Sequence, residues 1–151
     1  MTLVPIPDST PQAPPAVAGT PPLVLATADP SLARMLDFAL DQVRLPHVLY
    51  TSGTAALKAL LAMPATGIPP IVVLDVDLPG VDGHAILERL GVERPDTFLI
   101  VVLSSHADES VQVRSLLAGA LDHLAKPFNV RVLVAKLQRW HTIAATHRAA
   151  G

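Results

Sequence analysis

This chain has no cysteine and no excess of positive over negative charge, and each absence excludes a class of function. The lack of cysteine excludes a disulfide framework and a thiolate metal cluster. The 11 Lys and Arg residues are balanced by 13 Asp and Glu residues, so we predict no broad basic surface for nucleic acid or for an anionic membrane. The expected partners are therefore other proteins.

Long hydrophobic runs are also missing. The longest, residues 71–74 and 98–103, are far shorter than the roughly 20 residues that a membrane-spanning helix needs. The N-terminus lacks the basic-then-apolar order of a signal peptide. We therefore expect no membrane association and a cytoplasmic location. Half of the 151 residues are hydrophobic, which is enough for the core of one ordinary domain.

The N-terminal segment differs in composition from the rest of the chain. Residues 1–22 contain seven of the 15 prolines and one charged side chain, Asp8. Such a segment cannot bury enough apolar surface to offset its ordering entropy, so we predict disorder over residues 1–21. It is either an inert spacer or a proline-rich ligand for an aromatic groove, and the lack of a repeated motif with basic flanks favours the spacer.

From residue 23 onward, short apolar runs alternate with helical patterns. Strands are expected at residues 23–27, 47–50, 71–75, 97–103 and 122–125. Helices are expected at about residues 30–43, 55–61, 84–91, 108–118 and 129–148. This alternation predicts an α/β fold with a doubly wound parallel sheet and right-handed crossovers.

Capping residues mark the expected helix starts. Asp29 precedes a proline before the first helix, either Ser52 or Thr54 caps the second, and Asn129 caps the last. The last helix is expected to be longer than the strands of the sheet, so its final turns must project beyond the sheet. There Trp140 either seals the end of the domain or contacts another chain, and a lone aromatic favours the first reading.

The apolar positions of two helices predict which faces pack inward. Met35 is expected on the buried face of the first helix. In the fourth helix, the predicted inward residues are Val113, Leu116 and Leu117.

Asp75 ends a fully apolar strand and is followed by a turn rich in proline and glycine. The carboxyl ends of parallel strands are where α/β proteins build their sites. The same edge of the predicted sheet carries Thr27 at the end of the first strand, Ser104 after the fourth and Lys126 after the fifth. Two interpretations are open. In the structural one, Asp75 caps the loop and pairs with Lys126. In the functional one, the Asp75 carboxylate and the Lys126 ammonium group take part in a reaction.

Four motifs occur in a fixed order along the chain: Asp29–Pro30, LDVDLPGVDG at residues 74–83, LSS at 103–105, and AGALDHLAKPF at 118–128. With these motifs, residues 22–140 resemble the receiver domain of two-component response regulators. The resemblance implies a flavodoxin-like (βα)5 fold with strand order 2-1-3-4-5. It also implies a receiver domain over residues 22–141, with residues 142–151 extending the last helix and forming a tail.

Carried over to this sequence, the resemblance makes Asp75 the phosphoacceptor. Lys126 becomes the cation that binds Asp75 or its phosphate, and Ser104 the hydroxyl that reports phosphorylation. Lysine is a compact positive charge, which suits a site where a transferred phosphoryl group must be neutralised. The resemblance further implies a cis peptide bond between Lys126 and Pro127.

The sequence departs from the family pattern at the positions that normally hold the metal. Two adjacent acids end the first strand in the family, whereas Thr27 and Ala28 stand there here. Mg²⁺ prefers carboxylate oxygens in octahedral array, so we expect metal binding to be weak or absent, through Asp75 and the backbone carbonyl of Asp77. The side chains of Asp29 and Asp77 are less favoured candidates for metal ligands. Phosphorylation is then expected to be slow, absent or dependent on a partner.

His123 occupies the position on the fifth strand where the family usually has an aromatic residue that moves with the Ser104 hydroxyl. An imidazole could move similarly and respond to pH. His123 and Ser104 therefore form a candidate signalling switch, whereas the simpler interpretation of His123 is a partly exposed strand histidine. The other histidines show no metal-ligand spacing, and no metal cluster is predicted.

These observations leave three functions to separate. The leading one is a single-domain response regulator, phosphorylated by a sensor histidine kinase or phosphotransfer protein. It would contact a downstream protein through helix four, strand five and helix five, as a monomer or weak homodimer. It is not expected to be an enzyme beyond its own phosphorylation and dephosphorylation.

The alternative is a phosphorylation-independent pseudo-receiver docking module, in which the pair of Asp75 and Lys126 is structural. A third candidate, a flavodoxin-like enzyme binding FMN or a nucleotide, needs a phosphate-cradling loop after the first strand. Residues 27–30 offer no glycine and an acid that would repel phosphate.

Overall fold

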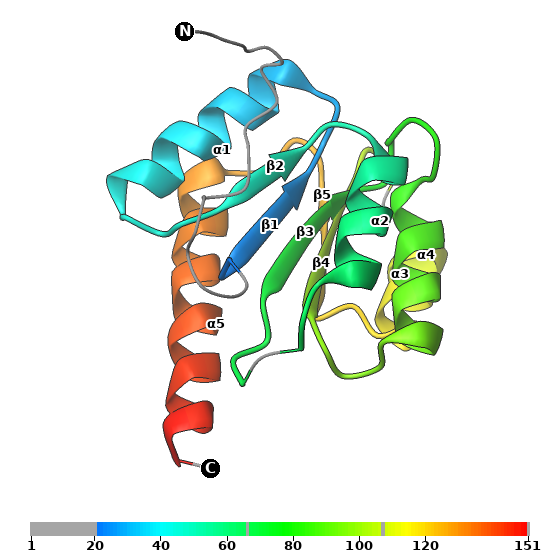
Figure 1. Cartoon of the computed structure of the whole chain (residues 1–151). Helices are drawn as coiled ribbons and strands as arrows, with labels where there is room; N and C mark the ends of the chain where they lie inside the picture. The colour runs from blue at the N-terminus through cyan, green and yellow to red at the C-terminus, as the bar shows by residue number, and fades with distance from the viewer. Residues whose placement is uncertain (1–20, 66, 107, 151) are drawn as a thin grey trace, which may run out of the picture.

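The computed structural model describes residues 21–65, 67–106 and 108–150, with side chains as far as residue 146. Five parallel strands form one sheet in the order β2-β1-β3-β4-β5 (Figure 1). The elements in chain order are β1 (Leu23–Ala26), α1 (Pro30–Gln42), β2 (Val48–Tyr50), α2 (Gly53–Ala62), β3 (Ile71–Asp75), α3 (Gly83–Glu93), β4 (Leu99–Ser104), α4 (Glu109–Leu117), β5 (Asp122–Ala125) and α5 (Val130–Ala150). The predicted fold is confirmed. Of the proline-rich segment expected to be disordered, residues 1–20 lie outside the described residues.

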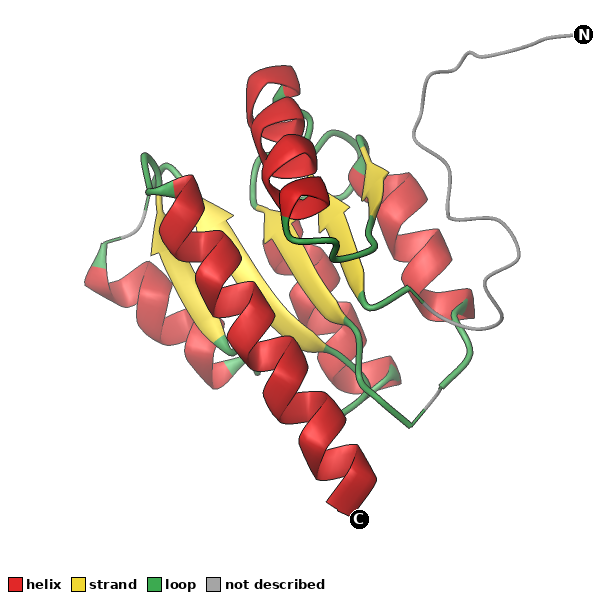
Figure 2. Cartoon of the chain, turned by 90° about the vertical axis from the view of Figure 1, so that its left-hand side faces the viewer, coloured by secondary structure: helices red, strands yellow, loops and turns green. Residues whose placement is uncertain are grey.

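The sheet is covered on both faces. Helices α1 and α5 pack on one face, and α2, α3 and α4 on the other (Figures 1 and 2). Successive strand residues point to opposite faces, so β1 sends Leu23 and Leu25 toward α1 and α5 and Val24 toward α2 and α3. Burial on both faces explains why the central strands read as continuous apolar runs.

The helix starts follow the predicted caps. The Asp29 carboxylate accepts hydrogen bonds from the backbone N–H groups of Ser31 and Leu32, at 3.0 and 3.2 Å. Ser52, one of the two candidates for α2, accepts from the Ala55 N–H at 3.0 Å and is its N-cap. The Asn129 side chain accepts a hydrogen bond from the first turn of α5.

The prediction of which α4 residues face inward was wrong. Val113, Leu116 and Leu117 are exposed, and Leu117 keeps 84% of its surface accessible. The buried residue of this helix is Ser115, which lies about 200° around the helix from Val113. Periodicity gives the relative positions of side chains, and here the tertiary contact of Ser115 decides which stripe faces the sheet. Met35, expected inside α1, is also exposed.

Helix α5 has 21 residues, and its C-terminal turns extend beyond the sheet (Figure 1). Trp140 packs against the core formed with α1, in agreement with the sealing interpretation. No helix within the described ranges is long and apolar enough to cross a membrane.

Candidate functional site

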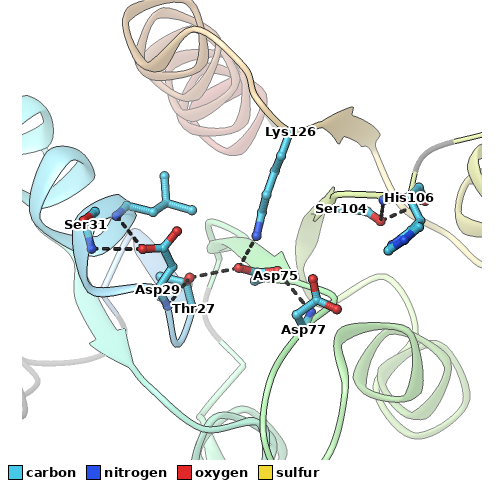
Figure 3. A network of polar contacts seen from close by, with 9 residues as sticks. Thr27, Asp29, Ser31, Asp75, Asp77, Ser104, His106 and Lys126 are labelled. Carbon is cyan, nitrogen blue, oxygen red and sulfur yellow. Dashed lines mark hydrogen bonds and ion pairs between the residues drawn. The ribbon is translucent and has the colours of Figure 1, made fainter.

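Asp75 is the last residue of β3 and is 1% exposed. Its Oδ2 atom accepts a hydrogen bond from Lys126 Nζ at 2.6 Å and another from the Thr27 hydroxyl at 2.9 Å. Its Oδ1 atom accepts from the Asp77 backbone N–H at 3.0 Å. Three donors from three segments therefore converge on one buried carboxylate (Figure 3).

Thr27 has a larger part in this site than the sequence indicated. Its hydroxyl donates to Asp75 and also accepts a hydrogen bond from the Asp29 N–H at 3.1 Å. The residue is 2% exposed, and its own N–H donates to the Tyr50 carbonyl at 3.1 Å. From the sequence alone, Thr27 stands only where an acid is missing. The signal that could have indicated its role is a hydroxyl donor at a strand end that adjoins the end of β3.

Lys126 reaches Asp75 from the loop between β5 and α5. Its backbone N–H donates to the Ser104 carbonyl at 2.8 Å, and the peptide bond to Pro127 is cis, as expected. The side chain of Lys126 is 19% exposed and that of Asp75 is 2% exposed. A charge-assisted hydrogen bond at this depth is among the stronger kinds. The two opposite charges leave the site close to electrically neutral.

Ser104 ends β4 at the same edge of the sheet and is buried. Its hydroxyl donates to the His106 carbonyl at 2.8 Å and accepts from the His106 N–H at 2.9 Å. Both hydrogen bonds lie within the loop that leaves β4 (Figure 3). The strand edge therefore brings Ser104 beside Asp75 in the sheet, while its hydroxyl is engaged by its own loop.

Close backbone packing fixes the loop that follows Asp75. A Cβ atom on Gly83 would lie 2.5 Å from the Asp75 carbonyl oxygen, so only glycine lets α3 begin this close to the end of β3. Gly80 has a φ of 86°, a conformation that glycine adopts at little cost. The turn motif thus holds the Asp77 N–H against the Asp75 carboxylate.

The oxygen atoms around Asp75 do not match what Mg²⁺ requires. Ala28 offers no ligand, and the Asp29 carboxylate turns away to cap α1 (Figure 3). Both carboxylate oxygens of Asp75 already accept hydrogen bonds. The exposed Asp77 side chain supplies one further carboxylate at this rim. A tightly held Mg²⁺ needs near-ideal octahedral oxygen coordination, which this set does not preorganise.

His123 is 6% exposed, so the simpler interpretation of a partly exposed histidine was wrong. Its Nδ1 atom lies 2.8 Å from the Ser115 hydroxyl of α4. Its Nε2 atom has no hydrogen-bond partner within the described part of the chain. Burial lowers the pKa of His123, His84 lowers it further, and Asp122 opposes the shift. The small polar Ser115 makes room for the imidazole and gives it a partner, which periodicity did not reveal.

This lowered pKa predicts acid-sensitive stability. The unfolded chain takes up the His123 proton near pH 6.5, whereas the folded chain does so only at lower pH. The free energy of unfolding should therefore fall as the pH drops below about 6.5, until the folded-state pKa is passed. Urea unfolding at several pH values should show a shallower fall for His123→Phe. Equal slopes for the two proteins would contradict the prediction.

Comparisons with known proteins agree with this geometry. The family model described as the response regulator receiver domain matches residues 24–138. The chain is 31% identical over 111 residues to the DNA-binding transcriptional regulator NtrC of Klebsiella pneumoniae, covering 74% of this chain and 23% of that protein. It is 34% identical over 127 residues to the transcriptional regulatory protein KdpE of Mycobacterium tuberculosis, covering 82% and 54% respectively.

A solved structure, the Francisella response regulator 1452 receiver domain, has the same fold. It superposes with a TM-score of 0.72 at 20% identity, covering 82% of this chain and 98% of that one. The chain spans between a quarter and about half of the length of the two curated relatives described above. With the strand order β2-β1-β3-β4-β5 and a family match over residues 24–138, the chain belongs to the response regulator receiver domain family of two-component signalling.

Proposed function

We propose that this receiver domain accepts a phosphoryl group on Asp75 and passes the signal on through protein contacts. The observation that carries this proposal is the contact of 2.6 Å between Lys126 Nζ and Asp75 Oδ2 at the carboxyl end of the sheet. A cation in that place neutralises charge that a phosphoryl group brings to a carboxylate. The donor would be a sensor histidine kinase or a phosphotransfer protein.

The hydrogen bonds favour Oδ1 of Asp75 as the attacking atom. Oδ2 is held by an ammonium group and a hydroxyl, whereas Oδ1 accepts a single backbone N–H. In the transfer, Oδ1 forms a bond to phosphorus and the bond from phosphorus to the donor's leaving group breaks, the leaving group taking the electron pair. The Lys126 ammonium and the Asp77 N–H then face the transferred group.

We expect this transfer to be slow and only weakly dependent on Mg²⁺. The adjacent acids that hold metal in the family are replaced by Thr27 and Ala28, and Asp29 is engaged as a helix cap. Without a tightly held dication, the transition state loses an electrostatic contribution that is usually large. A kinase or phosphotransfer partner that supplies charge of its own would restore part of it.

The exposed face of α4 supports the proposed output through protein contacts. Val113, Leu116 and Leu117 are exposed on this helix, and Leu121 is exposed just before β5. Neighbouring exposed apolar side chains are typical of protein interaction sites. The downstream partner would bind there, on the face formed by α4, β5 and α5.

A second candidate is a docking module that works without phosphorylation. It is favoured by one observation, the hydrogen bond of 2.9 Å from the Thr27 hydroxyl to Asp75. Together with Lys126, this donor saturates Oδ2 and gives the carboxylate a structural role. In that case the ion pair would hold the loops of the output face in place.

Mass spectrometry of the intact protein with a small-molecule phosphodonor separates the two candidates. The expected result is a slow gain of one phosphoryl group that is lost in Asp75→Asn and kept in Asp77→Asn, because Asp77 contributes through its backbone N–H. Adding Mg²⁺ should change the rate little. Rapid labelling that requires Mg²⁺ would contradict the weak metal site. No labelling, with partner binding unchanged in Asp75→Asn, would establish the docking module.

A further inference from the structure

Three potential metal ligands meet at the far end of α1. Asp37 and Asp41 are one helical turn apart on α1, and His47 stands just before β2. One ligand atom from each lies within 4.8 Å of the others. Because β1 and β2 are parallel, α1 must run back along the sheet (Figure 1). The cluster therefore lies at the edge opposite to Asp75 and is independent of the site described above.

Both ring nitrogens of His47 face oxygen atoms. Nδ1 lies 2.9 Å from the Leu45 carbonyl oxygen and Nε2 lies 2.7 Å from Asp37 Oδ1. A carbonyl oxygen can only accept, so Nδ1 carries a proton. The contact of 2.7 Å between Nε2 and Asp37 is a hydrogen bond, which a metal ion would replace once the Asp37 carboxylate turned to a wider spacing.

The orientation of His47 is that of a metal ligand. Histidines that bind metal usually donate their other ring N–H to a carboxylate or a backbone carbonyl, which fixes the ring and its tautomer. Here the Leu45 carbonyl has that role, and Leu45 is itself buried and bonded through its N–H to the Leu40 carbonyl at 3.0 Å. The His47 side chain is 7% exposed, so the ring is already held in one position.

The charges at this end of α1 also attract a cation. The C-terminal end of a helix carries a partial negative charge, which is stabilised by cations and destabilised by carboxylates. Asp41 lies in the last turn of α1 and Asp37 one turn earlier, and that last turn has no basic residue. The last turn therefore supplies no basic side chain to offset these two carboxylates.

We propose that Asp37, Asp41 and His47 bind a first-row divalent transition metal of the Zn²⁺ class. One imidazole and two carboxylates suit Zn²⁺ better than Mg²⁺ or Ca²⁺, which prefer oxygen ligands alone. Three protein ligands leave a position for water in a tetrahedral site, with ligand atoms roughly 3.3 Å apart. Both aspartates are exposed and free to rotate to that spacing. The ion would tie the end of α1 to the start of β2.

Titration of the full chain with Zn²⁺, in competition with a chromophoric chelator, tests this site. We expect one Zn²⁺ per chain, and we expect His47→Gln and Asp41→Asn each to weaken its binding at least about tenfold. The matched control is His106→Gln, an exposed histidine in the loop after β4 at the opposite edge. That variant and Asp75→Asn should bind Zn²⁺ as the unchanged protein does, since neither belongs to the cluster.

Asp41→Asn keeps the proposal testable if His47→Gln fails to fold, because Asp41 is exposed and its backbone contacts are retained. Zn²⁺ affinity that is unchanged in Asp41→Asn would overturn the proposal, as would its loss in His106→Gln. An absence of Zn²⁺ binding would likewise overturn it and leave the contact between His47 and Asp37 as a hydrogen bond alone. None of these results bears on phosphorylation of Asp75.

Discussion

Replacing Lys126 with methionine is expected to lower the free energy of unfolding by about 3 kcal/mol, because removing one partner of a buried ion pair leaves the other charge uncompensated. Asp75 is 1% exposed, so water cannot take the place of the ammonium group. Methionine has nearly the length of lysine and keeps most of its packing. The Thr27 hydroxyl and the Asp77 N–H remain, which places the loss at the lower end of the range for buried pairs.

Urea unfolding of paired variants separates charge from packing. Adding Asp75→Asn to Lys126→Met removes the stranded charge and should recover most of the loss. The control is Lys136→Met, since Lys136 pairs with Asp122 at 3.2 Å in a partly exposed position and such pairs contribute less than about 1 kcal/mol. If Lys126→Met costs no more than Lys136→Met, the pair of Asp75 and Lys126 does not stabilise the fold.

The architecture was predictable from sequence because its signals are local. The apolar runs at residues 71–74 and 99–103 lie in buried strands, and Asp29, Ser52 and Asn129 cap the helices expected after them. Parallel strands separated by helices then permit few arrangements. The location of Asp75 and Lys126 at the same edge of the sheet follows from that topology alone.

Side-chain contacts between distant elements were not predictable in the same way. The buried His123 contacts Ser115 of α4, and the orientation of α4 that buries Ser115 leaves Leu117 exposed. The Thr27 hydroxyl acts on a residue 48 positions away. His47 reaches Asp37 because a turn ends α1, although their separation in sequence matches no regular ligand motif. Each case depends on a tertiary distance that residue spacing does not encode.

Placing acids at positions 27 and 28, with Thr27→Asp and Ala28→Asp, is expected to create a Mg²⁺ site and to accelerate the proposed phosphorylation of Asp75. The double variant places three carboxylates opposite one lysine, so the excess negative charge attracts a dication. A pair of unit charges 4 Å apart is worth about 4 kcal/mol at an effective dielectric constant of 20. Even after losses to desolvation, Mg²⁺ affinity should rise by at least a factor of about 10.

The same variant should be less stable than the unchanged protein when Mg²⁺ is chelated, because Thr27→Asp replaces a hydrogen-bond donor to Asp75 with a like charge. Thermal unfolding with EDTA and with Mg²⁺ measures this coupling, and intact-mass kinetics measure the phosphorylation rate. Thr27→Asn with Ala28→Asn keeps the size of the new side chains without the charge and should gain neither effect. If both double variants remain indifferent to Mg²⁺, the absence of acids at positions 27 and 28 is not what limits Mg²⁺ binding at this site.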